Sequence, residues 1–319
     1  SPESLGIPSR SLLRFLDRLE AEGQDHHAFV LLRHGAVAAA GAWAPYRLDA
    51  AHRMFSVSKS VTSLAIGFMV QEGRLSLDDR AANLLPEALA ACRDPLLAAL
   101  TVRDLLRMAT GQANDPTFAL NDAPTWVGAF FREPCVEPPG RTFRYNSAAT
   151  YVLSALVTRL TGQPLTDYLQ DRLFGPLGFG PVPSEMSPEG ACAGGWGLFL
   201  RVGELARLGQ LVLQNGVYDG RRLLSAAYLA EATRVQIDTE AGFGRGYGYQ
   251  FWACPDGGFR MDGAFGQSCL VMPDRDVVFA ATNGLDDAAR FFRAAWSLRE
   301  DMADGPLPAD PPAFRVLQD

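Results

Sequence analysis

The chain has a single lysine among its 29 lysine and arginine residues, and this residue, Lys59, follows Ser56 by three positions. A desolvated lysine can lose its proton and act as a base, whereas an arginine cannot. Residues three apart at the start of a helix share one face, so the two side chains should meet. A serine hydroxyl becomes nucleophilic when such a base takes its proton. The pair predicts a nucleophile, Ser56, and its base, Lys59, although a serine precedes roughly one lysine in fifteen at this spacing by chance.

Histidine is the more usual base for a catalytic serine. The chain has four histidines, but none of its serines lies in the Gly-x-Ser-x-Gly elbow that a Ser-His-Asp hydrolase of the α/β kind would show. The sequence therefore favours lysine as the base.

The surroundings of Ser56 resemble the nucleophile helix of the serine β-lactamase and penicillin-binding-protein superfamily. Further stretches resemble the same superfamily at residues 72–79, 101–106, 109–111, 138–140, 143–145, 174–179, 194–197 and 247–252. The resemblance thus extends from about residue 55 to about residue 283. It implies that Ser56 is acylated, that Lys59 is its base, and that Tyr145 relays protons with Lys59. Without the motif, Tyr145 would be interpreted as a core aromatic residue.

Two motifs depart from the usual family pattern. The family usually has Tyr-x-Asn, but Ser147 stands at the third position here, which resembles the 6-aminohexanoate-dimer hydrolase branch. The family's third motif is usually Lys or His, then Thr and Gly, whereas residues 262–267 read Asp-Gly-Ala-Phe-Gly-Gln. In the relatives those groups help to hold the carboxylate of a β-lactam or of a D-Ala-D-Ala terminus, and this chain lacks them.

The stretch at 262–267 can still supply a backbone donor. Gly263 permits close approach of the chain, so the N–H groups of Ser56 and Ala264 would form a two-donor oxyanion hole. The alternative is an ordinary Asp-Gly hairpin turn. The residues expected to line the substrate cleft are Ser147, Asn114, Asp115, Trp126, Asp262 and Gly263.

Apolar periodicity predicts the elements that position these residues. Helices are expected at residues 10–23, 56–73, 102–108, 148–160, 165–173, 203–214 and, as the last helix, 286–301. Strands are expected at residues 28–32, 36–43, 248–253, 258–261, 267–272 and 277–282. Strands at both ends of the chain thus enclose a helical middle.

This pattern predicts an α+β fold in which one antiparallel sheet is assembled from both termini. The family resemblance implies the same β-lactamase/transpeptidase-like fold, with terminal helices on the sheet and the cleft between sheet and helices. We expect a sheet domain formed by residues 1–54 and 240–319, and a mostly helical domain formed by residues 55–239.

Composition limits the class of protein. The 319 residues are 48% hydrophobic and 20% charged, which is typical of a soluble globular chain. The formal charge of −7 argues against a nucleic-acid partner, and no apolar run is long enough to span a membrane. Five scattered cysteines fit neither a disulfide framework nor a zinc site. The cytoplasm is favoured, or the periplasm or exterior if a presequence was removed.

We therefore expect a serine hydrolase that acts on a small carboxylic ester or unstrained amide and needs no metal or organic cofactor. Two alternatives stay open: a β-lactamase or D,D-peptidase, and a penicillin-binding-like sensor or binding module that does not turn over. The sequence does not predict the oligomeric state.

Overall fold

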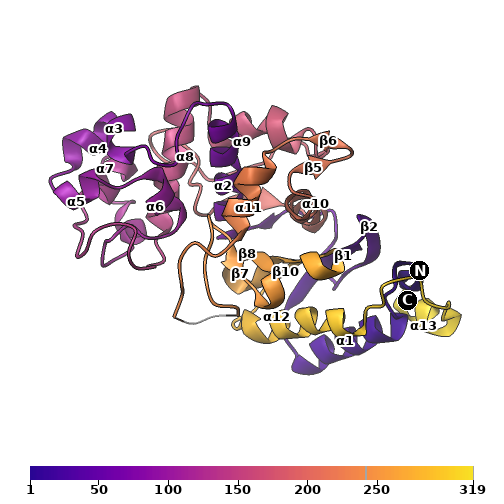
Figure 1. The fold of residues 1–319 in the computed structure, drawn as a ribbon. Coiled ribbons are helices and arrows are strands. Elements are labelled where there is room, and N and C mark those ends of the chain that lie inside the picture. Colours follow the sequence, from indigo (N-terminus) through magenta and orange to yellow (C-terminus); the bar gives the residue numbers. More distant parts are fainter. Residues whose placement is uncertain (241–242, 319) are drawn as a thin grey trace.

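The computed structural model describes residues 1–240 and 243–318. They form a six-stranded antiparallel sheet whose strands come from both ends of the chain (Figure 1). The strands follow the spatial order β2 (Ala36–Ala42), β1 (His26–Arg33), β10 (Val277–Asn283), β9 (Gln267–Met272), β8 (Phe259–Gly263) and β7 (Trp252–Ala253). The predicted α+β fold with one sheet built from both termini is confirmed.

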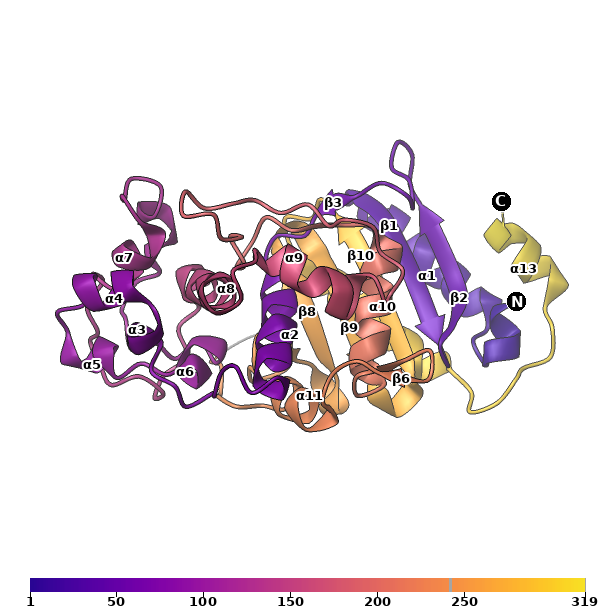
Figure 2. The same ribbon diagram turned by 90° about the horizontal axis from the view of Figure 1, so that it is seen from above.

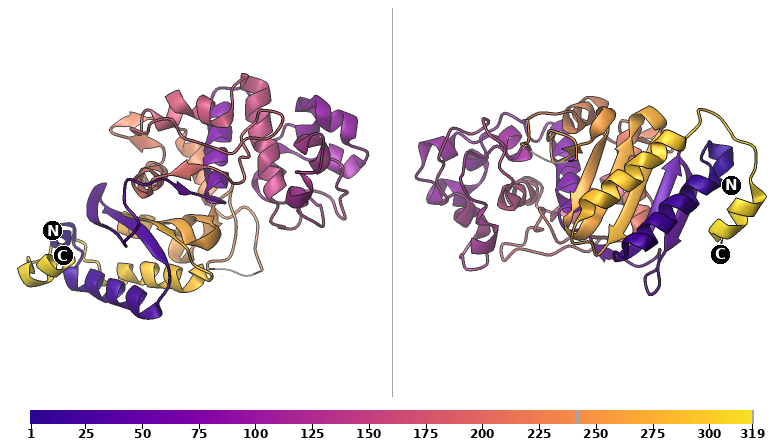
Figure 3. Two further views of the ribbon diagram at one scale, coloured as in Figure 1. Left: turned by 180° about the vertical axis from the view of Figure 1, so that it is seen from behind. Right: turned by 90° about the horizontal axis from the view of Figure 1, so that it is seen from below.

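Two helices from the ends of the chain, α1 (Ser9–Glu22) and α12 (Ala288–Ser297), cover one face of the sheet (Figure 3). The apolar side of α1 lies against β1 and β10, where the ring of Phe15 contacts the rings of Phe29 and Phe279. Gly23 ends α1 in a left-handed conformation with φ 61°, which suits glycine.

The other face of the sheet carries α2 (Val57–Gln71) and α10 (Val202–Leu213) (Figure 2). Residues 57–69 of α2 are all buried, although several are serine or threonine. Their hydroxyl groups are bonded: Ser60 donates to the Gln250 carbonyl at 2.6 Å, and Thr62 donates to the Gly194 carbonyl at 2.9 Å. These bonds fix α2 against distant parts of the chain, because a buried hydroxyl needs a partner.

A helical region extends beyond α2, away from the sheet (Figures 1 and 2). It contains α3 (Ala81–Leu84), α4 (Pro86–Ala91), α5 (Pro95–Ala98), α6 (Val102–Leu106), α7 (Trp126–Phe130) and α8 (Ser147–Thr161). The next helix, α9 (Leu165–Leu169), contacts α2 and α8 and lies on the α10 side of α2 (Figure 2). Elsewhere lie α11 (Ala226–Thr233) and two short strand pairs, β3 (His52–Arg53) with β4 (Phe199–Leu200) and β5 (Val217–Tyr218) with β6 (Arg221–Arg222).

Two predicted elements differ from the structure. The strand expected at 248–253 is reduced to β7, because Gln250 has a φ of 66° and the chain there cannot stay extended. The helix expected at 286–301 forms α12 and a short 3₁₀ turn, but it is not the last helix, since α13 (Pro311–Gln318) follows it. The sequence did not predict α13 because it begins with two prolines, which usually indicate a loop. Proline is nevertheless tolerated in the first turn of a helix.

The expected division into a sheet domain and a helical domain stays a prediction. Among the described helices, none combines the length and apolar character needed to cross a bilayer.

Candidate active site

Ser56 and Lys59 lie together at the start of α2. Nζ of Lys59 is 3.0 Å from Oγ of Ser56, and it donates a second hydrogen bond of 2.7 Å to the carbonyl oxygen of Gly195. Lys59 is only 2% exposed, whereas Ser56 is half-buried. The amine is thus enclosed while the hydroxyl stays accessible.

The surroundings of Lys59 disfavour its charged form. Burial lowers the pKa of Lys59 to about 7, and the negative charge of Asp115 only partly opposes this. A large fraction of the side chain is therefore unprotonated near neutral pH. A neutral amine 3.0 Å from a serine hydroxyl can accept its proton.

Tyr145 lies across the site from Ser56. Its ring centroid is 4.8 Å from Nζ of Lys59, and the ring stacks on Trp252 at 5.9 Å. The residue is 36% exposed, yet desolvation still raises the pKa of its hydroxyl, and the nearby charges of Asp262 and Asp115 act in the same sense. A hydrogen bond with Ser56 acts the opposite way on that pKa. Tyr145 is therefore a neutral phenol that can pass a proton at the Ser56–Lys59 pair.

Caps at the start of α8 hold Tyr145 in place. Oδ1 of Asn146 accepts a 3.0 Å hydrogen bond from the N–H of Ala149, and Oδ2 of Asp115 accepts a 2.7 Å bond from the N–H of Ser147. A carboxylate at a helix N-terminus interacts favourably with the unpaired N–H groups there. The Asp115 carboxylate thus anchors the segment that follows Tyr145 and also acts electrostatically on Lys59.

The predicted oxyanion strand lies directly against the nucleophile. A Cβ at Gly263 would be 3.3 Å from the amide nitrogen of Ser56 and 2.4 Å from the carbonyl oxygen of Met54, so only glycine fits. Ala264 follows at the exposed start of the turn into β9. In the described part of the chain, the N–H of Ser56 has no hydrogen-bond acceptor. The segments that carry the two predicted donors, the N–H groups of Ser56 and Ala264, therefore lie in contact with each other.

Two aromatic residues beside these donors have left-handed backbones. Phe55 has a φ of 46° and Phe265 a φ of 62°. For a residue with a side chain this conformation costs about 1–2 kcal/mol.

Three other predicted cleft residues have identifiable contacts. Asn114 is exposed and donates to Glu133 at 3.0 Å, so no contact brings it to Ser56. Trp126 is 5% exposed and packs on Trp196, the residue after the Lys59 acceptor Gly195. Oδ2 of Asp262 accepts a 2.9 Å bond from Arg260.

Asp262 is close enough for its charge to act on Tyr145. Burial raises the pKa of Asp262, and Arg260 opposes this rise. Ser147 contributes its backbone N–H to Asp115, as described above. The assignment of these residues to substrate binding stays a prediction.

Sequence reasoning gave no role to Gly195 or Gln250. The Gly-Gly-Trp-Gly run at 194–197 could have indicated the role of Gly195, because glycines let a backbone carbonyl approach a buried amine closely. No local pattern could reveal Gln250, since its side-chain partners lie 100 and 144 residues away in two other segments.

Gln250 joins the nucleophile helix to α6 and α8. Its side chain accepts a 2.7 Å bond from the Thr150 hydroxyl and donates to the carbonyls of Leu106 at 2.7 Å and Leu105 at 3.2 Å. Its own carbonyl accepts the Ser60 hydroxyl at 2.6 Å.

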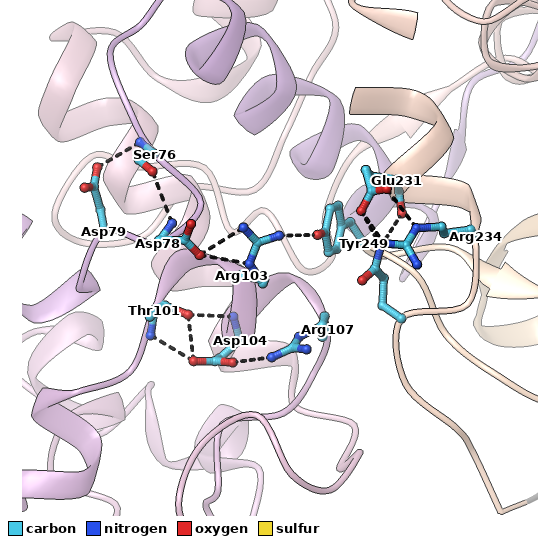
Figure 4. A network of polar contacts seen from close by, with 11 residues as sticks. Ser76, Asp78, Asp79, Thr101, Arg103, Asp104, Arg107, Glu231, Arg234 and Tyr249 are labelled. Carbon is cyan, nitrogen blue, oxygen red and sulfur yellow. Dashed lines mark hydrogen bonds and ion pairs between the residues drawn. The ribbon is translucent and has the colours of Figure 1, made fainter. Parts of the chain in front are cut away.

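The neighbouring residue extends this network. Figure 4 shows that the Tyr249 hydroxyl accepts a hydrogen bond from Arg103 of α6, which is also paired with Asp78. The segment at Tyr249 and Gln250 thus connects α2, which begins after Ser56, with α6 and α8.

Replacing Gln250 should measurably destabilise the fold. Gln250→Leu is expected to lower the free energy of unfolding by about 1–3 kcal/mol, because the Thr150 hydroxyl would be left buried without its acceptor. Urea denaturation measures the change. The control Gln71→Leu, at an exposed position in α2, should cost less than about 0.5 kcal/mol. Equal losses in the two variants would contradict this role.

The family model for beta-lactamase matches residues 16–302, nearly the whole chain. The protein therefore belongs to the beta-lactamase family. Its site geometry and its relatives agree with this class. Penicillin-binding protein 4 of Amycolatopsis lactamdurans is 30% identical over 290 residues, which cover 76% of this chain and 74% of that protein. The 6-aminohexanoate-dimer hydrolase of Paenarthrobacter ureafaciens is 26% identical over 299 residues, which cover 85% of this chain and 75% of that protein.

A solved structure shares the fold. EstCE1, a hydrolase with promiscuous acyltransferase activity, superposes with a TM-score of 0.73 at 18% identity, covering 92% of this chain and 98% of that one. The predicted resemblance to the superfamily, including its 6-aminohexanoate-dimer hydrolase branch, is confirmed.

Proposed function

We propose that this protein hydrolyses carboxylic esters or unstrained amides through an acyl-enzyme on Ser56, with Lys59 and Tyr145 as the proton-transfer groups. The observation that carries the proposal is the 3.0 Å contact between Ser56 and a buried lysine whose pKa is about 7. The general base and the nucleophile are thus already in reach of each other before substrate binds.

The reaction proceeds in two steps, acylation of Ser56 and hydrolysis of the acyl-enzyme. Neutral Lys59 takes the Ser56 proton as Oγ bonds to the substrate carbonyl carbon, and the oxyanion accepts hydrogen bonds from the N–H groups of Ser56 and Ala264. The bond to the leaving group breaks, and that group takes the proton from Lys59 through Tyr145, which leaves Lys59 neutral again. Water then adds to the acyl carbon while Lys59 removes one of its protons. The bond to Oγ breaks, Oγ takes that proton back from Lys59, and the acid departs.

The charge beside the oxyanion strand favours substrates without a carboxylate. Asp262 occupies the region where the superfamily motif usually has a cation and a threonine, and among the residues that the structure describes only Arg260 forms an ion pair with it. Arg260 is 4% exposed and also donates to the carbonyls of Phe243 and Ala253, so it is not free to bind a substrate anion. A substrate carboxylate would therefore meet repulsion here.

The relatives support both halves of this proposal. One is named a 6-aminohexanoate-dimer hydrolase, and another, from Penicillium rubens and 28% identical over 170 residues, is named a lovastatin esterase. The name penicillin-binding protein 4 keeps β-lactam chemistry as the competing function. Direct comparison of substrates separates the two.

We expect kcat/KM for p-nitrophenyl acetate or butanoate to exceed that for benzylpenicillin or nitrocefin by roughly 100-fold or more, because the site lacks donors for the β-lactam carboxylate. Initial rates at matched pH and enzyme concentration measure the ratio, with Ser56→Ala as the blank for surface hydrolysis. Penicillin turnover equal to or faster than ester turnover would establish the β-lactamase alternative instead.

The Asp262→Asn variant tests the reason for that preference. Removing the negative charge should raise kcat/KM for benzylpenicillin relative to the uncharged ester by roughly tenfold. Thermal unfolding checks that Arg260 tolerates the neutral partner. An unchanged ratio in a folded variant would remove Asp262 from the explanation.

A further inference from the structure

The two strained aromatic residues lie one on each side of the proposed oxyanion hole. Phe55 directly precedes Ser56, and Phe265 directly follows Ala264. Their φ angles of 46° and 62° belong to a conformation that bulky side chains rarely adopt. Such strain persists where the surrounding structure enforces it, and it concentrates at functional sites.

The two rings meet at the surface instead of in the core. Their centroids are 5.1 Å apart at an interplanar angle of 63°, an edge-to-face contact. Phe265 is 51% exposed and Phe55 is half-buried. An aromatic surface therefore stands open to solvent beside the nucleophile.

Buried polar side chains hold the turn that carries Phe265. Nε2 of Gln267 donates to the carbonyl of Asn283 at 2.6 Å, and Nδ2 of Asn283 donates to the carbonyl of Gly266 at 2.7 Å. Oδ1 of Asn283 lies 2.8 Å from Nδ1 of His26. Nε2 of Gln267 also lies 3.3 Å from the carbonyl of Ala264, so the backbone is held on both sides of Phe265 and the ring projects from a fixed point of the chain.

The proposed reaction relates this surface to one part of the substrate, and the inference rests on that reaction. The carbonyl oxygen points to the two N–H donors, and the leaving group points toward Tyr145, which supplies its proton. The acyl substituent takes the remaining direction at the carbonyl carbon. It stays attached to Ser56, whose neighbour in the chain is Phe55.

We propose that Phe55 and Phe265 form a binding platform for the acyl group, and that the preferred acyl groups are aromatic. An aromatic acyl group gains edge-to-face and offset contacts with the two rings in addition to the burial of apolar area. A short aliphatic acyl group reaches only part of the platform.

The test compares two esters with the same leaving group, p-nitrophenyl 3-phenylpropanoate and p-nitrophenyl butanoate. We expect kcat/KM to favour the phenylpropanoate by about tenfold or more in the unmodified protein. In Phe265→Asn the ratio should fall to about twofold or less. Asparagine adopts left-handed conformations more readily than phenylalanine, so the variant should unfold at no lower temperature.

Two further variants refine the comparison. Phe265→Leu keeps apolar bulk without a ring, so its ratio should fall between those of the other two proteins. Val37→Asn replaces an exposed apolar residue of β2, at the opposite edge of the sheet, and should leave the ratio as it is.

An unchanged ratio in Phe265→Asn would overturn the platform while the proposed function stands. The same holds if Phe265→Asn instead changes the preference between 2-phenylethyl acetate and butyl acetate, whose leaving alcohols have similar acidity. If the unmodified protein turns over none of these esters above the Ser56→Ala blank, the proposed function itself fails.

Discussion

Ser56→Ala is expected to abolish ester hydrolysis, with a loss on the order of 10³-fold or more, because no other group can form the acyl-enzyme. A fluorophosphonate probe should correspondingly add its mass to Ser56. The lone lysine helps the measurement, since trypsin cleaves after Arg53 and Lys59 and releases residues 54–59 as a short peptide. Intact-protein and peptide mass spectrometry report the modification.

The matched control is Ser76→Ala, which changes an exposed serine whose contacts are confined to its own loop (Figure 4). This variant should keep both activity and probe labelling. Labelling at another residue, together with hydrolysis by Ser56→Ala, would exclude the proposed nucleophile.

Much of the fold could be predicted because its signals are local. Alternating and helical apolar patterns located the helices and strands of the sheet layers, including β9 at its observed bounds. The failures have local causes as well. Gln250 takes a left-handed backbone that no residue pattern indicates, and α13 begins at two prolines that read as a loop.

Residue spacing alone predicted only the part of the site whose residues are neighbours in sequence, and Tyr145 and Ala264 were found through the family resemblance. Ser56 and Lys59 meet because residues three apart lie almost one helical turn from each other. Lys59 was identified as the base because it is the only lysine in the sequence. The carbonyl of Gly195 comes from a segment 136 residues away, and the contact of Phe55 with Phe265 joins opposite ends of the chain. Such contacts arise from tertiary packing, which periodicity does not report.

Capping shows a second limit of sequence reasoning. Asp115 was expected to line the cleft, but the structure makes its carboxylate an acceptor for the N–H groups of Ser147, Ala148 and Thr117. An acidic side chain near an active site can accept hydrogen bonds from backbone N–H groups as well as contact a substrate, and only the three-dimensional structure shows which of these it does.

Lys59→Met is expected to reduce kcat/KM for an uncharged ester by roughly 100-fold or more, because methionine nearly matches the length of lysine but accepts no proton. Lys59→Arg should be similarly impaired, since a guanidinium keeps the charge and cannot serve as base. Initial rates with p-nitrophenyl butanoate measure both losses. Retention of activity within about tenfold in Lys59→Met would contradict the assignment of the base.

The pH dependence gives an independent test of the same residue. Since the active form of Lys59 is the neutral amine and its pKa is about 7, kcat/KM should rise with pH up to about 7 and then level off. The residual activity of Lys59→Met should lack this inflection.

Stability should respond to the same titration. The pKa of about 7 in the folded protein lies below the ordinary lysine pKa of 10.5, so between these values the unfolded chain binds the proton that the folded protein has lost. The free energy of unfolding of the unmodified protein should therefore rise with pH across this window, by an amount on the order of 5 kcal/mol, while Lys59→Met loses that rise. Urea denaturation of both proteins at pH 7 and pH 9.5 compares the slopes. Parallel slopes would mean that the amine is not desolvated in the folded protein, and the reason for its action as a base would be lost.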